Sequence, residues 1–222
     1  MKTLHRWLFA ALLAVPGLAL ADVALPPLAD APTSVRPLLL GSPVPAVDVT
    51  RLDGTSVPLR ELVGSQRSVI VFYRGGWCPY CNLQLQGLRL IREPLAKLGY
   101  RLIAISPDSP ASMRATLDKT PLEYTLVSDA SSAAIRAFGL AYRLDDATYE
   151  KYAGHGIDLE KASGQGHHAL PVPAVYLTDG AGTLQFSYVH PDYKVRMPEK
   201  VILAAAEALA ADEENFARRL KK

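Results

Sequence analysis

The feature that most constrains the fold of this chain is a pair of cysteines, Cys78 and Cys81, set between two contrasting sequence patterns. They are the only cysteines among the 222 residues. Residues 68–73, just before them, are almost wholly apolar, as expected for a strand buried on both faces. After Cys81, apolar residues recur every three or four positions up to Leu98, which is the period of a helix. The sequence therefore predicts a strand, a cysteine pair and a helix in direct succession.

This position gives the two cysteines a distinct chemical environment. Cys78 is expected at the N-cap of the helix, with Pro79 at its first position. Unpaired backbone N–H groups and the helix dipole favour a thiolate there and lower the pKa of the cysteine. The thiolate is the attacking species in disulfide exchange, and Cys81, one turn further on, is placed to close an internal disulfide with Cys78. We therefore expect a redox pair whose sulfurs are ionised and reachable by solvent.

Three other uses of two cysteines fit less well. A zinc site needs about four ligands, and only the distant His155, His167 and His168 could complete one. Covalent haem attachment needs a histidine directly after the second cysteine, where Asn82 stands. A purely structural disulfide gains stability mainly by closing a long loop, and a two-residue spacer closes almost none. We expect no metal and no other cofactor.

Three neighbours of the pair are candidates for supporting roles, each with a simpler alternative. Arg74 would add positive charge near the sulfurs, or it is a solvated loop residue. Trp77 would contact substrate, or it fills the core. Tyr73 would hydrogen-bond near the active sulfur, although its strand position makes core packing the default interpretation.

The dipeptide Val172–Pro173, directly before a predicted strand at 174–178, is a further candidate. A proline suits the first residue of a strand. A cis peptide bond between Val172 and Pro173 is the more specific interpretation. It would bring the backbone of Val172 up to Cys78, where it would offer hydrogen bonds to an incoming peptide or thiol.

The rest of the chain alternates between strand and helix patterns. We expect a hairpin over 47–59, strands at 100–105 and 124–127, helices at 109–119, 130–138 and 199–209, and a second hairpin at 174–178 and 184–189. Pro94 should kink the helix that follows the cysteines. Residues 145–168 are polar and look like an insertion with at most a weak helical pattern. The domain is expected at 44–212, between a loose segment at 22–43 and a charged tail at 213–222. This order predicts an α/β three-layer sandwich with an N-terminal β-hairpin extension.

The N-terminus has the pattern of a secretory signal peptide. A basic start precedes an apolar run at 7–20, and small residues allow cleavage after Ala21. An uncleaved anchor is the alternative, although the run is shorter than the roughly 20 residues that a span needs. Cleavage leaves 201 residues (222 minus 21), in which 22 basic residues balance 22 acidic ones. We expect a periplasmic or otherwise secreted protein that binds no nucleic acid and keeps no membrane insertion.

The strand–Trp-Cys-Pro-Tyr-Cys–helix arrangement, with Val-Pro before a hairpin far downstream, resembles the thioredoxin fold. The tetrapeptide Cys-Pro-Tyr-Cys is also familiar from glutaredoxins. Four segments resemble the alkyl hydroperoxide reductase/thiol-specific antioxidant (AhpC/TSA) family of peroxiredoxin-like proteins: VPAVDVTRLDG at 44–54, LIAISPD at 102–108, TLVSD at 125–129 and AFG at 137–139. The likeness covers roughly residues 43–212. It implies a central mixed β-sheet flanked by helices, and antioxidant thiol chemistry on peroxides.

The two resemblances disagree about which sulfur attacks. Against thioredoxins, Cys78 is the nucleophile and Cys81 resolves. Against peroxiredoxins, the peroxidatic cysteine falls on Cys81, Arg74 and Cys78 replace the family's proline and threonine, and its peroxide-binding arginine falls near Pro173. Arg74 is then the obvious stand-in for the donors that stabilise the leaving oxygen.

The sequence thus predicts a thiol-dependent oxidoreductase that reduces peroxides through a Cys78–Cys81 disulfide and is reset by a thioredoxin-like protein dithiol. The alternatives are a protein disulfide oxidoreductase and a non-catalytic binding module of the same fold. The histidines at 155, 167, 168 and 190 are expected to be solvated, with a role in substrate binding as the alternative. Asp108 and Asp129 are expected to end strands, with an acid–base role as the alternative.

Overall fold

The computed structural model of this chain describes residues 24–118 and 121–220, and the side chains of these residues up to 212. The predicted signal peptide at 1–21 lies outside the described residues. Within the described part of the chain, no helix is long and apolar enough to cross a membrane.

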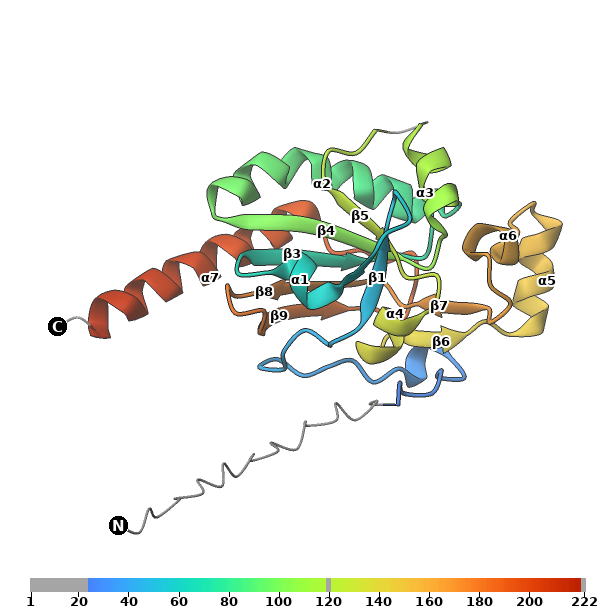
Figure 1. Ribbon diagram of the computed structural model, residues 1–222, viewed down its shortest axis with the longest axis horizontal. Helices are drawn as coiled ribbons and strands as arrows, with labels where there is room; N and C mark the ends of the chain where they lie inside the picture. The colour runs from blue at the N-terminus through green and yellow to red at the C-terminus, as the bar shows by residue number, and fades with distance from the viewer. Residues whose placement is uncertain (1–23, 119–120, 221–222) are drawn as a thin grey trace, which may run out of the picture.

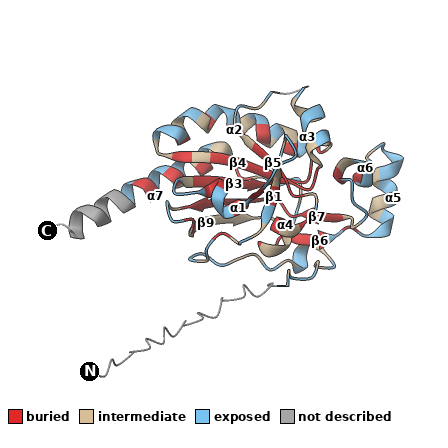
Figure 2. Cartoon of the chain, in the orientation of Figure 1, coloured by how far each residue is buried: buried red, intermediate tan, exposed pale blue. Residues whose placement is uncertain are grey.

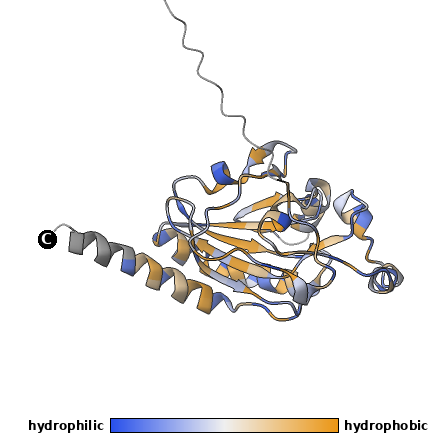
Figure 3. Ribbon diagram, turned by 90° about the horizontal axis from the view of Figure 1, so that it is seen from below, coloured by the Kyte–Doolittle hydropathy of each residue, from blue (hydrophilic) through white to orange (hydrophobic). Residues whose placement is uncertain are grey.

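The centre of the molecule is a seven-stranded sheet with the strand order β2-β1-β5-β4-β3-β8-β9 (Figure 1). Three central strands run parallel, and antiparallel strands complete both sides of the sheet. The strands are β1 (Asp48–Arg51), β2 (Ser56–Pro58), β3 (Arg67–Phe72), β4 (Tyr100–Ser106), β5 (Thr125–Ser128), β8 (Ala174–Thr178) and β9 (Leu184–Val189). Their hydrophobic residues form a continuous central layer (Figure 3).

Helices cover both faces of this sheet, because alternate residues of its strands point to opposite sides. Val69 and Val71 pack into one core with α2 (Pro79–Lys97), α3 (Pro110–Leu117) and α7 (Glu199–Leu220). Ile70 and Phe72 pack into the other with α1 (Leu59–Val63), α4 (Ala133–Ala137) and the two-stranded sheet of β6 (Ala141–Arg143) and β7 (Ala169–Pro171). Buried residues fill the strands and the inner sides of the helices (Figure 2). The predicted mixed sheet flanked by helices is confirmed.

Several predicted boundaries differ from the structure. The segment 145–168 forms two helices, α5 (Asp146–Gly154) and α6 (Leu159–Ser163), each capped by an aspartate side chain that accepts a backbone hydrogen bond. Helix α7 runs to Leu220, through most of the predicted charged tail. Helix α2 runs past Pro94 to Lys97, in agreement with the helical period predicted up to Leu98.

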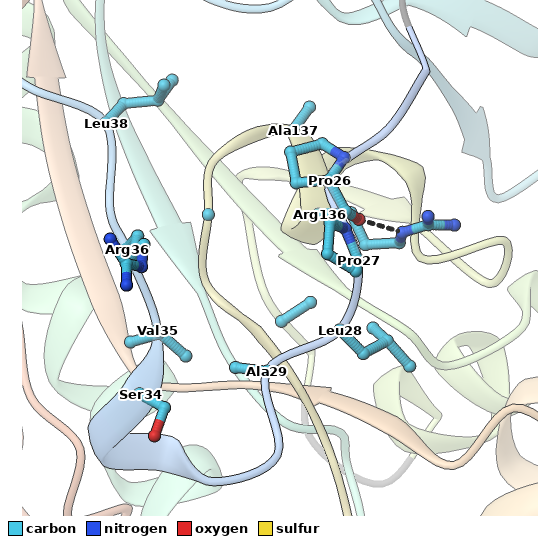
Figure 4. A pocket seen from close by; sticks show the side chains of 12 residues that line it. Pro26, Pro27, Leu28, Ala29, Ser34, Val35, Arg36, Leu38, Arg136 and Ala137 are labelled. Atoms are coloured by element: carbon cyan, nitrogen blue, oxygen red, sulfur yellow. Dashed lines mark hydrogen bonds between the residues drawn. The ribbon is translucent and has the colours of Figure 1, made fainter.

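The N-terminal segment, predicted to be loose, follows the body of the molecule. It contains a short 3-10 helix, η1 (Pro32–Ser34), and its backbone bonds to Ala141, Gly139 and Leu184. Gly139 has φ +67°, and a Cβ there would lie 1.9 Å from the carbonyl oxygen of Arg36, so the close approach needs glycine. Between this segment and α4 lies an apolar cavity of about 380 Å³, beside which Arg136 donates to the carbonyl of Pro26 (Figure 4).

Candidate redox site

The cysteine pair lies where β3 passes into α2. Cys78 is the N-cap residue of α2 and Pro79 is its first residue. Proline suits that position, because its fixed φ is pre-organised for the helix and its missing N–H would have no partner in the first turn. Cys81 follows in the same first turn, so both sulfurs lie at the amino end of a 19-residue helix.

Two glycines shape the turn before Cys78. A Cβ on Gly75, whose φ is +151°, would lie 2.2 Å from the indole nitrogen of Trp77. A Cβ on Gly76 would lie 2.1 Å from Oγ1 of Thr116. Asp108 holds the turn from the end of β4, because its carboxyl accepts from the Gly76 N–H at 2.7 Å and from the Trp77 indole. Burial raises the pKa of Asp108 to about 7, although these hydrogen bonds act in the opposite direction. The role of the carboxyl is therefore to stabilise the turn before Cys78.

The two thiols differ sharply in acidity. The Cys81 thiol donates toward the sulfur of Cys78, and this interaction is the main reason that the pKa of Cys78 falls to about 6. The backbone N–H of Cys81 also favours the Cys78 thiolate, without the geometry of a full capping hydrogen bond, and Arg74 and Arg196 add positive charge. Burial and the bond to Cys78 raise the pKa of Cys81 well above its ordinary value. Cys78 is therefore the thiolate of the pair and Cys81 the thiol.

Both cysteines are free thiols, and both are buried. Cys78 is 1% exposed and Cys81 is 0% exposed, so the expectation that solvent reaches the sulfurs is wrong for this structure. The segment between β9 and α7 lies against them through Arg196, which the sequence did not indicate.

Arg196 is a residue of the redox site that no sequence pattern indicated. Its Nη2 lies 3.3 Å from Sγ of Cys81 and 4.0 Å from Sγ of Cys78. The guanidinium is anchored by the carbonyl of Tyr193, at 2.7 and 3.0 Å, and by the side chain of Gln84, at 3.0 Å. It also lines a surface cavity of about 280 Å³, together with Gln84 and Met197. Arg196 thus connects this cavity to the two sulfurs.

Arg74 is buried rather than solvated, with 1% exposure. Its guanidinium lies over the rings of Trp77, Tyr152 and Tyr193 and donates to the hydroxyl of Tyr152 at 2.8 Å. Trp77, which is half-buried, therefore packs on this cation as well as binding Asp108.

Tyr73 points into the core. Its hydroxyl hydrogen-bonds the side chain of Ser106, and burial raises its pKa. Its backbone N–H pairs with Ile105, which extends the β3–β4 ladder by one residue. These contacts match the core-packing interpretation of Tyr73.

The cis interpretation of Val172–Pro173 is wrong, whereas Pro173 does stand directly before strand β8. No cis peptide bond occurs in the described residues. The N–H of Val172 donates to Leu140 at 3.1 Å, and the carbonyl of Pro173 accepts from His190 at 3.1 Å. Both of these groups are therefore paired within the body of the protein.

The other candidates have structural roles. His167 bonds the backbone of Ala130 and Ala169, and His168 pairs with Glu160 at 2.8 Å and stacks on Tyr149. His155 caps α5, His190 accepts from the Asp192 N–H, and Asp129 accepts from the first N–H groups of α4. Among the described residues, no group of three or more histidine, cysteine or acidic side chains is arranged to hold a metal ion.

A dithiol of unequal acidity at the start of a helix, on a thioredoxin-like sheet, defines the class of thiol-dependent oxidoreductases. Comparison with known proteins gives the family. The family model described as "AhpC/TSA family" matches residues 40–187, and the chain belongs to this family.

Relatives and solved structures agree with this membership. The chain is 32% identical over 106 residues to Peroxiredoxin Bcp of Escherichia coli, a match that covers 48% of this chain and 67% of that protein. Its fold is similar to Peroxiredoxin 6 of Arenicola marina (TM-score 0.63, 17% identity, 78% of this chain and 73% of that one). It is also similar to Peroxiredoxin Q of Xanthomonas campestris (TM-score 0.59, 20% identity, 78% and 97%). Arg196 lies beyond the residues that match the family model.

Proposed function

We propose that this protein is a thiol peroxidase that reduces peroxides through Cys78 and Cys81. The observation that carries the proposal is the polarised thiol pair with the guanidinium of Arg196 against both sulfurs. The family relatives are named peroxiredoxins, and one similar structure is that of a Xanthomonas campestris protein with alkyl peroxide reduction activity.

Cys78 is the attacking residue in this proposal. A peroxide is opened by a thiolate, and near pH 7 Cys78 is the sulfur that is largely ionised. This assignment follows the thioredoxin-like order of the two cysteines. The peroxiredoxin-like order, in which Cys81 attacks, would require ionising the more buried sulfur beside an existing thiolate.

The proposed cycle has three balanced steps. The Cys78 thiolate attacks one peroxide oxygen, the O–O bond breaks, and the leaving oxygen takes a proton to become an alcohol or water. The resulting sulfenic acid on Cys78 condenses with the Cys81 thiol, which forms the disulfide and releases water. A thioredoxin-like dithiol protein then reduces that disulfide and is itself oxidised.

Arg196 stabilises the charge that develops on the leaving oxygen. It touches both sulfurs and lines the adjacent cavity, so a peroxide that enters from the cavity would meet the guanidinium and the thiolate together. Positioned donors of this kind act strongly in a site from which water is excluded. Because the sulfurs are buried, the side chains at this entrance must move to admit substrate and reductant.

The working compartment in this proposal is the periplasm or the exterior. The support is the basic and apolar pattern of residues 1–21. Cell fractionation and mass spectrometry of the mature N-terminus test it: a product that begins at Asp22 in the soluble extracytoplasmic fraction is expected. A full-length chain in the cytoplasm or in the membrane fraction would refute it.

The activity is tested by coupling peroxide consumption to a thioredoxin-like reductant. We expect peroxide-dependent oxidation of the reductant, and peptide mapping should show a Cys78–Cys81 disulfide after one equivalent of peroxide. Reduction of insulin without peroxide turnover would instead indicate a protein disulfide oxidoreductase and overturn the proposal.

A further inference from the structure

Arg74 is a buried cation with no carboxylate within ion-pair distance among the described residues. Its side chain is 1% exposed, and its Nε has no hydrogen-bond partner. Burying a charge is costly unless another charge or a set of hydrogen bonds compensates it. Arg74 must therefore be held by its neutral neighbours and by the sulfurs.

The neutral neighbours form a cage of aromatic rings. The guanidinium carbon lies 4.4 Å from the ring centre of Tyr193, 5.1 Å from that of Trp77 and 5.4 Å from that of Tyr152. The hydroxyl of Tyr152 accepts a hydrogen bond from the guanidinium at 2.8 Å, and Tyr142 interacts with it electrostatically. Cation–π contacts in a desolvated site hold a guanidinium in place without neutralising it.

The cage draws on distant parts of the chain. Trp77 belongs to the turn before α2, Tyr142 to β6 and Tyr193 to the segment before α7. Tyr152 belongs to α5, in the segment 145–168 that the sequence analysis interpreted as an insertion. It also packs against Trp77, with ring centres 5.8 Å apart. Through this one side chain, the segment contacts Arg74 and Trp77, which lie next to the redox pair.

The anion that interacts with Arg74 is the Cys78 thiolate. Burial alone would lower the pKa of Arg74, but Tyr142, Tyr152 and the Cys78 sulfur raise it. Arg74 in turn lowers the pKa of Cys78. Closing the Cys78–Cys81 disulfide removes the thiolate and leaves the caged cation without an anionic neighbour. The arrangement therefore favours the dithiol form over the disulfide.

We propose that Tyr152 is a positioning residue of the redox site, which holds Arg74 beside the cysteine pair and so makes the segment 145–168 part of the redox machinery. The proposal rests on the redox role of Cys78 and Cys81, and it holds for any oxidant of the pair.

The other ionisable groups near the redox pair have partners of their own, so Arg74 is the cation that Tyr152 holds in place. Asp108 is engaged by the turn at Gly76, and its charge would raise the pKa of Cys78. His167 and His168 line a cavity of only about 10 Å³ with Arg74, and both have other partners. Arg196 also acts on the sulfurs, but its anchors are Tyr193 and Gln84.

The test compares Tyr152→Phe with Tyr149→Phe in the full chain. Phenylalanine keeps the ring against Trp77 and removes only the hydroxyl. Tyr149 is a matched control, because it lies on the same helix and stacks on His168. The readouts are the pH profile of iodoacetamide alkylation and the dithiol–disulfide equilibrium against dithiothreitol at pH 7. The chain has no other cysteines that could contribute to either measurement.

For Tyr152→Phe we expect alkylation at pH 5 to slow roughly three- to tenfold, because Arg74 loses a hydrogen bond that holds its charge near the Cys78 thiolate. The equilibrium should move toward the disulfide by roughly threefold, since the thiolate contributes less to the dithiol form. Tyr149→Phe should match the wild type in both. Equal behaviour of Tyr152→Phe, Tyr149→Phe and wild type would overturn the proposal.

A double substitution separates an effect through Arg74 from a general loosening. Arg74→Met removes the buried charge while filling the cage, a change that cores often tolerate. In that background, Tyr152→Phe should have no further effect on either readout. If it still slowed alkylation, Tyr152 would act by another route and the assignment would be wrong. Both readouts work without peroxide, so a failure of peroxide turnover would leave this inference separately testable.

Discussion

Nη2 of Arg196 lies 3.3 Å from Sγ of Cys81, although 115 residues separate the two in the chain. The contact brings the segment before α7 onto the amino end of α2. It places a cation beside the buried thiol, while Arg74, whose guanidinium lies over the Tyr193 ring, adds further positive charge. Two arginines that both contact Tyr193 thus supply positive charge to the redox pair.

Replacing Arg196 should slow the reaction with peroxide. We expect Arg196→Met to lower kcat/KM for hydrogen peroxide by roughly 10²–10³, the range for loss of one donor to a developing oxyanion. Lys97→Met is the control, since Lys97 is the last residue of α2, at the end opposite the cysteines, and pairs there with Glu93 at 3.0 Å. Stopped-flow peroxide consumption measures both. Near-wild-type rates for Arg196→Met would remove this residue from the mechanism.

The two cysteine variants should fail at different steps. Cys78→Ser should lose all reaction with peroxide, because the thiolate of the pair is gone. Cys81→Ser should complete one turnover and stop at a sulfenic acid on Cys78, which dimedone traps and mass spectrometry detects. A sulfenic acid on Cys81 in the Cys78→Ser protein would reverse the assignment and support the peroxiredoxin-like order.

The reactivity of Cys78 should follow its lowered pKa. With a pKa of about 6 and an ordinary thiol value near 9.0, the group is mostly thiolate at pH 7. Alkylation of the reduced protein should therefore be nearly constant above about pH 7 and fall about tenfold per pH unit well below the pKa, as the thiolate is protonated. Mass spectrometry of each site across the pH range measures this. A midpoint above pH 8 would contradict the electrostatic account.

The turn before Cys78 should tolerate no side chain at Gly76. A Cβ there would lie 2.1 Å from Oγ1 of Thr116, so Gly76→Ala forces α3 or the turn to move. We expect a loss of about 1–3 kcal/mol in the free energy of unfolding by urea, as for other overpacked sites. Thr116→Ala should restore part of it. Gly154→Ala, which meets nothing within 4 Å, is the control and should be close to neutral.

Much of the local architecture follows from the chain itself. The apolar run of β3, the proline at the start of α2 and the three- and four-residue period after Cys81 are local patterns, and they fix strand, turn and helix in order. Strands β8 and β9 have the predicted bounds. Helices α5 and α6 did carry a usable local signal, the capping aspartates at 145 and 158. The short strands β6 and β7 had none, because three residues each are strands only through their pairing.

The amino-acid sequence by itself determined the fold class, the helix-capping position of Cys78 and the family to which the chain belongs. Hydrogen bonding, helix dipoles and apolar periodicity act between near neighbours in the chain, so they are visible in its order. Only the tertiary structure decided that Arg196 reaches the sulfurs, that Tyr152 holds Arg74 and that both thiols are buried. These contacts join residues whose approach depends on how the whole chain buries its apolar surface, which no local pattern encodes.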